Sequence, residues 1–345
     1  MHYNTEYILN SFAWLIKDWL DAEIDSVKEL KADASDRKIY RLISGSKSFI
    51  GVFNENVKEN RAFIYFSKLF HDLKLNVPEI HCVSADENFY LEEDLGDTTL
   101  FGFSINKSYS ELTKYYRQAV KDLIGFQLNT KDHIDYSYCI GKGGLDSSII
   151  NSDLNKFYNY FVKKFHKKKS GKIEIEYNQI TELSEIFSNV NEQTEKSFFM
   201  YRDFQPRNIM LRNEKLYYID YQSGMKGPLQ YDLVSFLYSG SVFLKEEEKE
   251  ELLDYYLLQI SNKIKLDTPQ FRNTFYYYAL LRIFQVLGSY GYQYEQKNNK
   301  NMLLKMKKAL SNLDEMKKSF KNKKVSDFVE SLLANANPDK NVNPS

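Results

Sequence analysis

Apolar residues recur at helical spacing near the start of the chain. Between residues 5 and 22, apolar side chains fall three or four positions apart, among them Ile8, Phe12 and Ile16. Such a stripe predicts an amphipathic helix that packs on a core. Residues 56–73 return to the same period, so a second helix of this kind is predicted there.

Between these two helices the pattern changes to short apolar runs that are typical of β-strands. Residues 39–43 and 48–53 flank a polar segment that contains Gly45, which predicts a β-hairpin. Further runs at residues 77–80 and 89–91 predict two more strands. The N-terminal part of the chain is therefore predicted to be a small antiparallel sheet accompanied by helices.

The rest of the chain is predicted to be mainly helical and to end in a polar tail. Residues 1–94 are expected to form the first domain and residues 95–333 the second, while residues 334–345, which contain two prolines, are expected to be a disordered tail. Helices are predicted at residues 108–128, 151–166, 178–190, 228–242, 244–262, 268–290 and 299–333.

Composition excludes several classes of function. The 345 residues include 47 Lys and Arg and 47 Asp and Glu, and this zero net charge argues against a general nucleic-acid binder. Cys82 and Cys139 are too few for a disulfide framework and fit a reducing compartment. No apolar run is long enough to span a membrane, and the N-terminus lacks a signal-peptide pattern. We therefore expect a cytoplasmic protein without membrane or nucleic-acid partners.

One break in the helical part carries the candidate chemistry. The apolar runs 198–201 and 216–219 flank a polar loop that holds Asp203 and Asn208, and Asp220 follows the second run. If the two runs pair as a hairpin, these three side chains converge at one end of it. Phosphoryl transfer needs a carboxylate to orient the attacking hydroxyl and oxygen ligands for Mg²⁺. The pattern therefore predicts a site where a cation between Asn208 and Asp220 lies beside Asp203.

The spacing Arg202-Asp203, then Asn208 and Asp220, resembles the catalytic loop and metal motif of protein-kinase-like phosphotransferases. It is most similar to the aminoglycoside phosphotransferase and choline kinase branch, where a sequence such as Ile-Asp-Tyr-Gln at 219–222 replaces the DFG motif. Within that branch, the chain resembles cell-wall amino-sugar kinases, which phosphorylate the anomeric hydroxyl of N-acetylmuramate or N-acetylglucosamine. Other segments match this subgroup in the same order along most of the chain.

This resemblance implies a fold, two cofactors and several roles. The fold would be α+β and bilobal, with an antiparallel sheet in a small N-lobe, a larger helical C-lobe, and ATP between the lobes. Asp203 would be the catalytic carboxylate, and Asn208 and Asp220 would bind Mg²⁺. Asp232, in a segment that resembles a helix start of this branch, would brace the backbone of the catalytic loop without taking part in the chemistry.

The resemblance also implies residues for the nucleotide. The sequence at 34–37 resembles a phosphate-facing loop, so Ser35 and Arg37 are expected to contact phosphate. The sequence Glu-Glu-Asp-Leu-Gly at 92–96 resembles the hinge between lobes, where the main chain of Glu93 and Leu95 would pair with adenine.

Three further residues are candidates for the substrate side. Asp153 opens a segment similar to a substrate helix of the subgroup, although capping a helix is its alternative role. Arg207 is expected to contact substrate or phosphate, or else to form a surface ion pair. Arg282 lies within an apolar helical segment, where it is either a substrate ligand or a buried bracing group.

The sequence also departs from the protein-kinase pattern. No lysine occurs in the strand at 49–53, where protein kinases hold the residue that pairs with the α- and β-phosphates, and Ala34 stands where a glycine is common. Arg37 or Lys38 on the preceding strand could supply the charge. Glu59, early in the following helix, would then lack its usual lysine partner.

The resemblance thus implies a small-molecule kinase, with a sugar or amino sugar such as N-acetylmuramate or N-acetylglucosamine as acceptor. Two alternatives remain, an aminoglycoside phosphotransferase and a non-catalytic kinase-like sensor of nucleotide or sugar. Residues 140–172, expected on the substrate side, hold more lysine than acid, which disfavours a polycationic acceptor. The exact acceptor, ATP against GTP, and the oligomeric state stay open.

Overall fold

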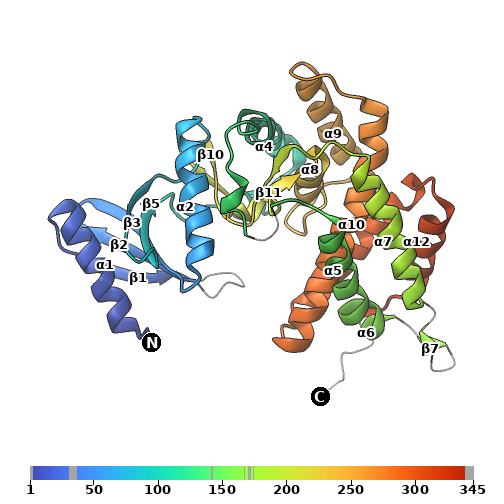
Figure 1. Ribbon diagram of the computed structural model, residues 1–345, viewed down its shortest axis with the longest axis horizontal. Coiled ribbons are helices and arrows are strands. Elements are labelled where there is room, and N and C mark those ends of the chain that lie inside the picture. The colour runs from blue at the N-terminus through green and yellow to red at the C-terminus, as the bar shows by residue number, and fades with distance from the viewer. Residues whose placement is uncertain are drawn as a thin grey trace. The chain divides into compact units, whose positions relative to one another are not determined.

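The computed structural model of the chain describes residues 3–30, 37–140, 143–166, 168–169, 172–173 and 175–338. The chain forms two compact units, each built from separate stretches of the sequence (Figure 1). The first unit comprises Met1–Gly143 and Tyr201–Met225, and the second comprises Gly144–Met200 and Lys226–Ser345. The domain division proposed above at residue 94 stays a prediction.

An antiparallel sheet of five strands is the centre of the first unit (Figure 1). The strand order is β1-β2-β3-β5-β4, and each neighbouring pair is antiparallel. Two helices accompany the sheet, α1 (Thr5–Leu20) and α2 (Val57–Asp72). The strands are β1 (Ser26–Leu30), β2 (Lys38–Ser44), β3 (Lys47–Phe53), β4 (Ile80–Val83) and β5 (Phe89–Glu93).

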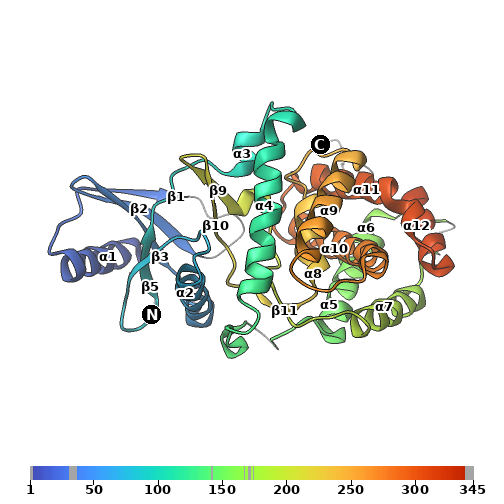
Figure 2. The ribbon, with the colours of Figure 1, turned by 90° about the horizontal axis from the view of Figure 1, so that it is seen from above.

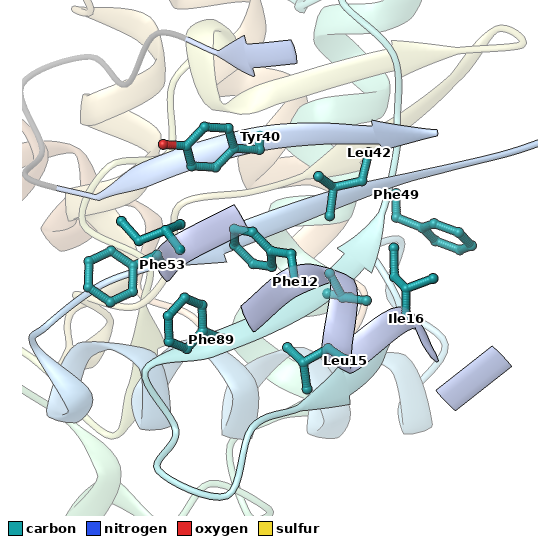
Figure 3. Packing of buried hydrophobic residues seen from close by; sticks show 10 residues of the cluster. Phe12, Leu15, Ile16, Tyr40, Leu42, Phe49, Phe53 and Phe89 are labelled. Carbon is teal, nitrogen blue, oxygen red and sulfur yellow. The ribbon is translucent and has the colours of Figure 1, made fainter. Parts of the chain in front are cut away.

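One face of the sheet is apolar and is covered by α1 (Figure 3). The ring of Phe12 meets Phe89 edge-on, with 5.4 Å between ring centroids. The helix approaches so closely that a Cβ at Gly51 would lie 2.8 Å from Leu42 and 2.9 Å from Phe12, so glycine is required there. The cluster consists of Ile8, Phe12, Leu15, Ile16, Tyr40, Leu42, Phe49, Phe53, Phe89 and Leu91.

The opposite face carries the alternate residues of the same strands. The register pairs Val52 with Tyr90 and Ile50 with Glu92, so these four side chains share this face. Helix α2 packs here, with the ring of Phe63 stacked on Tyr90 at 5.4 Å. We call this the polar face, because it carries Tyr90 and Glu92.

The remainder of the first unit places a long helix beside a short hairpin (Figure 2). Tyr218 on the hairpin donates a hydrogen bond to Asp122 of α4, 2.7 Å between oxygens. The elements are α3 (Leu100–Ser104), α4 (Tyr109–Asn129), the 3₁₀ turns η1 (Tyr136–Tyr138) and η3 (Pro206–Asn208), β9 (Ile209–Arg212) and β10 (Lys215–Tyr218).

Helices dominate the second unit, around α10. Gly288 and Gly291 of α10 let the backbone of the neighbouring helical segment approach, because a Cβ at either position would clash with Phe157 or Tyr160 backbone atoms. The elements are α5 (Ser147–Phe157), the π-turn η2 (Tyr158–Val162), α6 (Lys163–Phe165), β6 (Lys168–Lys169), β7 (Lys172–Ile173), α7 (Tyr177–Glu192), β8 (Phe198–Met200), β11 (Met225–Gly227), α8 (Leu229–Leu237), α9 (Glu246–Ser261), α10 (Thr268–Gln296), α11 (Met302–Met316), η4 (Lys317–Ser319) and α12 (Lys323–Asn335).

The predicted combination of an antiparallel sheet followed by a mainly helical part is confirmed. Among the described residues, no helix is both long and apolar enough to cross a membrane. Strands β1, β6, β7, β9 and β11 lie where the sequence predicted none. The strand expected at 77–80 begins only at Ile80, since Pro78 has no N–H to donate to a ladder. The helix expected at 299–333 breaks after Met316 and restarts where the Asn322 side chain caps α12.

The pairing considered for the two apolar runs around the candidate loop is wrong. β8 pairs with β11, and β10 pairs with β9 in register Lys215 with Arg212. The two residues between β9 and β10, Asn213 and Glu214, both have positive φ, 49° and 60°. That is the geometry of a two-residue hairpin turn whose twist matches its strands. The local turn therefore pairs β10 with β9.

Candidate active site

Asp203, Asn208 and Asp220 are brought together without the expected hairpin. The side-chain nitrogen of Asn208 donates to the carbonyl oxygen of Asp203 at 2.9 Å and to Oδ2 of Asp220 at 3.3 Å. The backbone N–H of Ile219 donates to the carbonyl oxygen of Asn208 at 3.0 Å. The Tyr201 hydroxyl donates to the carbonyl oxygen of Ile219 at 2.5 Å, which ties both ends of the segment.

Two residues of the same segment have a left-handed backbone conformation. Arg202, just before the candidate catalytic carboxylate, has φ 75°, and Asp220 has φ 69°. A non-glycine residue with this left-handed conformation costs roughly 1–2 kcal/mol. Strain of this size persists only where surrounding contacts hold it, and it concentrates at functional sites. The hydrogen bonds of Asn208 and Tyr201 supply such contacts.

Arg37 forms ion pairs with two carboxylates at this site. Its Nη2 lies 2.7 Å from Oδ1 of Asp220, and its Nε lies 3.6 Å from Oε1 of Glu59 on α2. Only 14% of the Arg37 side chain is exposed. Burial alone would lower the pKa of Arg37, but the attraction of Asp220, together with Tyr90 and Glu59, raises it above its ordinary value. The guanidinium is therefore a fixed positive charge between α2 and Asp220.

Side chains alternate between the two faces along β2, so Arg37 and Lys38, the two candidates for the phosphate charge, lie on opposite faces of the sheet. Lys38 is two residues from Tyr40, whose side chain packs in the α1 cluster, so Lys38 shares that face. Arg37 falls in step with Ile39, which pairs with Val52 on the polar face. Glu59 consequently has an arginine where lysine was the expected partner.

Gln222 is a member of this network that sequence reasoning missed. Its side-chain nitrogen donates to Oδ1 of Asp220 at 2.8 Å and lies 3.4 Å from Oε1 of Glu59. The side chain is buried, and its Oε1 has no hydrogen-bond partner among the described residues. Its place in the motif, two residues after Asp220, was the one available signal.

Hydrogen bonds to Asp94 link the predicted hinge to the β2–β3 hairpin. Arg41 donates to both carboxylate oxygens of Asp94, at 2.6 and 3.0 Å, and Ser48 donates at 2.5 Å. Burial would raise the pKa of Asp94, but these hydrogen bonds and one from the Gly96 N–H hold it below its ordinary value. The hinge backbone is thus held by the sheet itself.

The two hinge residues predicted to bind the nucleotide are both described. The side chain of Glu93 forms an ion pair with Arg212 of β9 at 2.6 Å, and Leu95 is buried. Their neighbour Glu92 lies on the polar face, and burial raises its pKa to about 8. Its Oε2 is sealed from solvent and has no hydrogen-bond partner in the described part of the chain.

The remaining predicted residues are more scattered. The Arg207 guanidinium lies 4.0 Å from the centre of the Phe101 ring on α3. In the second unit, Arg282 donates to Gln285 at 2.9 Å and lies 5.8 Å from the Tyr231 ring, and Asp153 is half-buried on α5. Asp232 is fully buried in the first turn of α8. Ser35 lies outside the described residues.

The donor set at the first unit's site fits magnesium and phosphate. Asn208 uses its side-chain nitrogen in hydrogen bonds, which leaves its side-chain oxygen Oδ1 free among the described residues. Together with Asp220 it offers the hard oxygen donors that Mg²⁺ prefers, and Mg²⁺ often takes one or two protein ligands and completes its shell with phosphates and water. Within the described ranges, no group of three His, Cys, Asp or Glu side chains could hold a metal ion.

Comparison with a family model decides the affiliation. The model of APH, the phosphotransferase enzyme family, matches residues 26–267. The chain belongs to this family. The match spans both the sheet of the first unit and the loop from Asp203 to Asp220. The predicted resemblance is therefore confirmed.

Two curated relatives of this APH chain carry the same name. It is 25% identical over 204 residues to the N-acetylmuramate/N-acetylglucosamine kinase of Pseudomonas aeruginosa, covering 59% of this chain and 56% of that protein. It is 23% identical over 230 residues to the protein of that name in Pseudomonas putida, covering 62% of this chain and 60% of that one. The chain thus spans a little over half the length of these relatives.

Solved structures share the fold of this APH chain. The choline kinase LicA from Streptococcus pneumoniae has a TM-score of 0.59 at 14% identity, covering 89% of this chain and 99% of that one. The spectinomycin phosphotransferase APH(9)-Ia, solved with ADP and spectinomycin, has a TM-score of 0.55 at 16% identity, covering 94% and 98%. These likenesses confirm the predicted fold class.

Proposed function

We propose that this APH-family protein is an ATP- and Mg²⁺-dependent kinase that phosphorylates a hydroxyl group of an amino sugar, with N-acetylmuramate and N-acetylglucosamine as the leading acceptors. The observation that carries the proposal is the network of Arg37, Glu59, Asn208 and Asp220. It puts a fixed cation beside a pair of hard oxygen donors. Phosphoryl transfer relies on such groups to position the triphosphate and to neutralise its charge.

Each residue has a defined task in this proposal. Asn208 and Asp220 hold Mg²⁺, which supplies charge neutralisation at the phosphates when bound. Arg37 attracts the phosphate oxygens, and Ser35 contributes a further phosphate contact. Asp203 orients the acceptor hydroxyl and accepts its proton as the oxygen attacks the γ-phosphorus.

The other predicted roles complete the site. The main chain of Glu93 and Leu95 pairs with the adenine base, and the link from Asp94 to the sheet keeps that backbone in place. Asp232 braces the catalytic loop. Asp153, Arg207 and Arg282 are the candidates for recognising the acceptor.

The acceptor class rests on the curated relatives. Two proteins about 25% identical to the chain are named N-acetylmuramate/N-acetylglucosamine kinases. The choline kinase and aminoglycoside phosphotransferase likenesses, at 14–16% identity, support the fold alone. A non-catalytic sensor is disfavoured, because Asp203, Asn208 and Asp220 are all retained and linked by hydrogen bonds.

An ADP-release assay with Mg-ATP tests the proposal. The acceptor panel is N-acetylmuramate, N-acetylglucosamine, glucosamine, choline and kanamycin. We expect turnover on an acetylated sugar and a loss of about 10³-fold in kcat for Asp203→Ala, since the general base is removed. Asp132→Ala, an exposed aspartate of the same unit, is the matched control and should keep full activity. Turnover on kanamycin alone, or ATP binding with no turnover on any acceptor, would contradict the proposed function.

A further inference from the structure

A groove lies on the α1 side of the first unit, between α1 and the turn that joins β4 to β5. Its volume is about 320 Å³, within the range of about 300–1,000 Å³ that is typical of small-molecule sites. Leu15 and Phe89, two buried members of the α1 cluster, form part of its lining. Phe89 lies on the opposite face of the sheet from Tyr90, so the groove is separate from the candidate active site.

Two aromatic side chains of α1 line this groove and remain largely exposed to solvent. Tyr7 is 47% exposed and Trp14 is 61% exposed. They are seven positions apart, so two helical turns bring them to the same side of α1. The ring centroid of Tyr7 lies 6.2 Å from that of the buried Phe89. Aromatic faces attract both aliphatic groups and cations, so the groove suits a ligand that combines the two.

Asp86, in the turn between β4 and β5, gives the groove a negative charge. Its Oδ1 accepts hydrogen bonds from the Ser84 hydroxyl at 2.6 Å and the Asn88 N–H at 3.2 Å, and its Oδ2 accepts one from the Asn88 side chain at 3.1 Å. Burial would raise the pKa of Asp86, but these hydrogen bonds hold it below its ordinary value. A carboxylate has about four acceptor positions, so this fixed and ionised group can accept one hydrogen bond more.

Helix α1 adds two further hydrogen-bond acceptors to the lining. The Ser11 hydroxyl donates to the carbonyl oxygen of Tyr7 at 2.9 Å, and its oxygen can still accept. Asn10 contributes the oxygen of its side-chain amide. Of the described residues that line the groove, none carries a positive charge. Charge and hydrogen bonding together favour a cation that has N–H groups to donate.

We propose that this groove binds a free aliphatic amine as its primary ammonium ion. The three N–H groups of the ammonium donate to Asp86, Asn10 and Ser11, and the aliphatic chain lies against the rings of Tyr7 and Trp14. The inference does not depend on the proposed function, because it uses none of the residues that we assign to the nucleotide, the metal or the acceptor.

A fluorescence titration tests this directly, because the chain has only two tryptophans, Trp14 and Trp19. Trp19 contacts the rings of Phe49 and His81, and Trp19→Phe keeps an aromatic ring there while it leaves Trp14 as the only reporter. The probes are n-butylammonium, the neutral n-butanol, and tetramethylammonium, which is a cation without N–H groups. Each is added without nucleotide and at constant ionic strength.

We expect n-butylammonium to change the Trp14 emission saturably, with a Kd of about 1 mM, and the other two probes to bind about 10-fold more weakly or worse. Asp86→Asn, which removes the charge but keeps the shape, should weaken n-butylammonium binding by about 5-fold or more. Asp18→Asn, an exposed acid of α1 outside the groove, is the matched control and should leave Kd unchanged. Circular dichroism shows that each variant is folded.

Trp14→Ala provides a second test that does not alter the turn around Asp86. Because Trp14 is exposed, the variant should fold like the wild type. Isothermal titration calorimetry should show that its affinity for n-butylammonium is lower by about 10-fold or more.

Three results would overturn the proposal. The first is equal affinity for n-butylammonium and either of the other probes, and the second is an unchanged Kd in both Asp86→Asn and Trp14→Ala. The third is displacement of the amine by Mg-ATP or by N-acetylglucosamine, because the amine would then occupy the candidate active site. None of these results bears on the kinase assay, so the proposed function is judged separately.

Discussion

The two faces of the five-stranded sheet are built from the same strands but serve different ends. The α1 face buries ten apolar or aromatic side chains and no charge. The polar face buries Arg37 and the unpaired Oε2 of Glu92, groups whose removal from water costs free energy. Alternation along each strand keeps the two sets apart. The α1 face thus stabilises the fold. The polar face lowers the free energy of unfolding, because it buries polar groups that form the candidate site.

The largest expected effect on stability comes from a substitution in the α1 face. Phe12→Ala removes a fully buried ring that contacts Phe89 and the backbone region of Gly51, so we expect the free energy of unfolding to fall by about 3–5 kcal/mol. Trp14→Ala, on the exposed side of the same helix, is the control and should change it by less than about 0.5 kcal/mol. Denaturant unfolding measures both. Equal losses for the two variants would mean that α1 does not stabilise the unit through this face.

A similar change on the polar face should act on function instead. Arg37→Met removes the charge that faces Asp220 and Glu59, and we expect kcat/KM for ATP to fall by about 10²–10³-fold. Arg37→Lys should lie between this variant and the wild type, because it keeps the charge but not both contacts. Steady-state kinetics below the melting temperature measure the effect.

The control for that experiment lies on the exposed side of α2. Arg61→Met removes a surface arginine that forms an ion pair with Glu87, and its kinetics should match the wild type. An Arg37→Met variant with activity within about threefold of the wild type would show that another group carries the phosphate charge.

A pH dependence of stability sharpens the comparison between the two faces. The pKa of Glu92 is about 8 in the folded chain against an ordinary value of 4.5, so the folded state holds its proton more tightly than the unfolded state. Wild-type stability therefore decreases as pH rises from about 4.5 to 8, and the loss is complete above pH 8. Glu92→Gln has no such proton. We expect it to gain up to about 4 kcal/mol over the wild type between pH 5 and pH 9.

Paired denaturant titrations at the two pH values measure this difference, and titrations common to both proteins cancel. A difference that stays constant or falls with pH would contradict the raised pKa of Glu92. An effect of the same size in Glu79→Gln, where the acid is exposed, would assign the dependence to the general charge balance instead.

Most of the fold and the motif could be predicted from the sequence, because both depend on short-range patterns. Helical periodicity located α1 and α2, and apolar runs located β2, β3 and β5. The spacing of Asp203, Asn208 and Asp220 pointed to the site before its geometry was known. The pairing of β10 was decided by two residues with positive φ, and Asn213-Glu214 is not a sequence with a strong turn signal.

The contacts that link distant parts of the chain were beyond the sequence. Arg37 and Asp220 are 183 positions apart, and the sequence could not decide between Arg37 and Lys38 until the strand phase was known. Gln222 and Glu92 lay inside recognised motifs, but the roles in those motifs were assigned to their neighbours. Their importance follows from a buried amide and a buried carboxyl oxygen that lack partners, and burial depends on the tertiary structure.

The role proposed for Arg37 at the phosphates affects how the protein can be detected. Acylating nucleotide probes label kinases by transferring an acyl group to a lysine amine beside the phosphates, which requires a neutral nitrogen nucleophile. In this network the cation is Arg37, whose guanidinium stays protonated, and Lys38 belongs to the opposite face of the sheet. Profiling by lysine acylation would therefore pass over this protein, whereas an arginine-directed dicarbonyl reagent, competed by nucleotide, would report on its site.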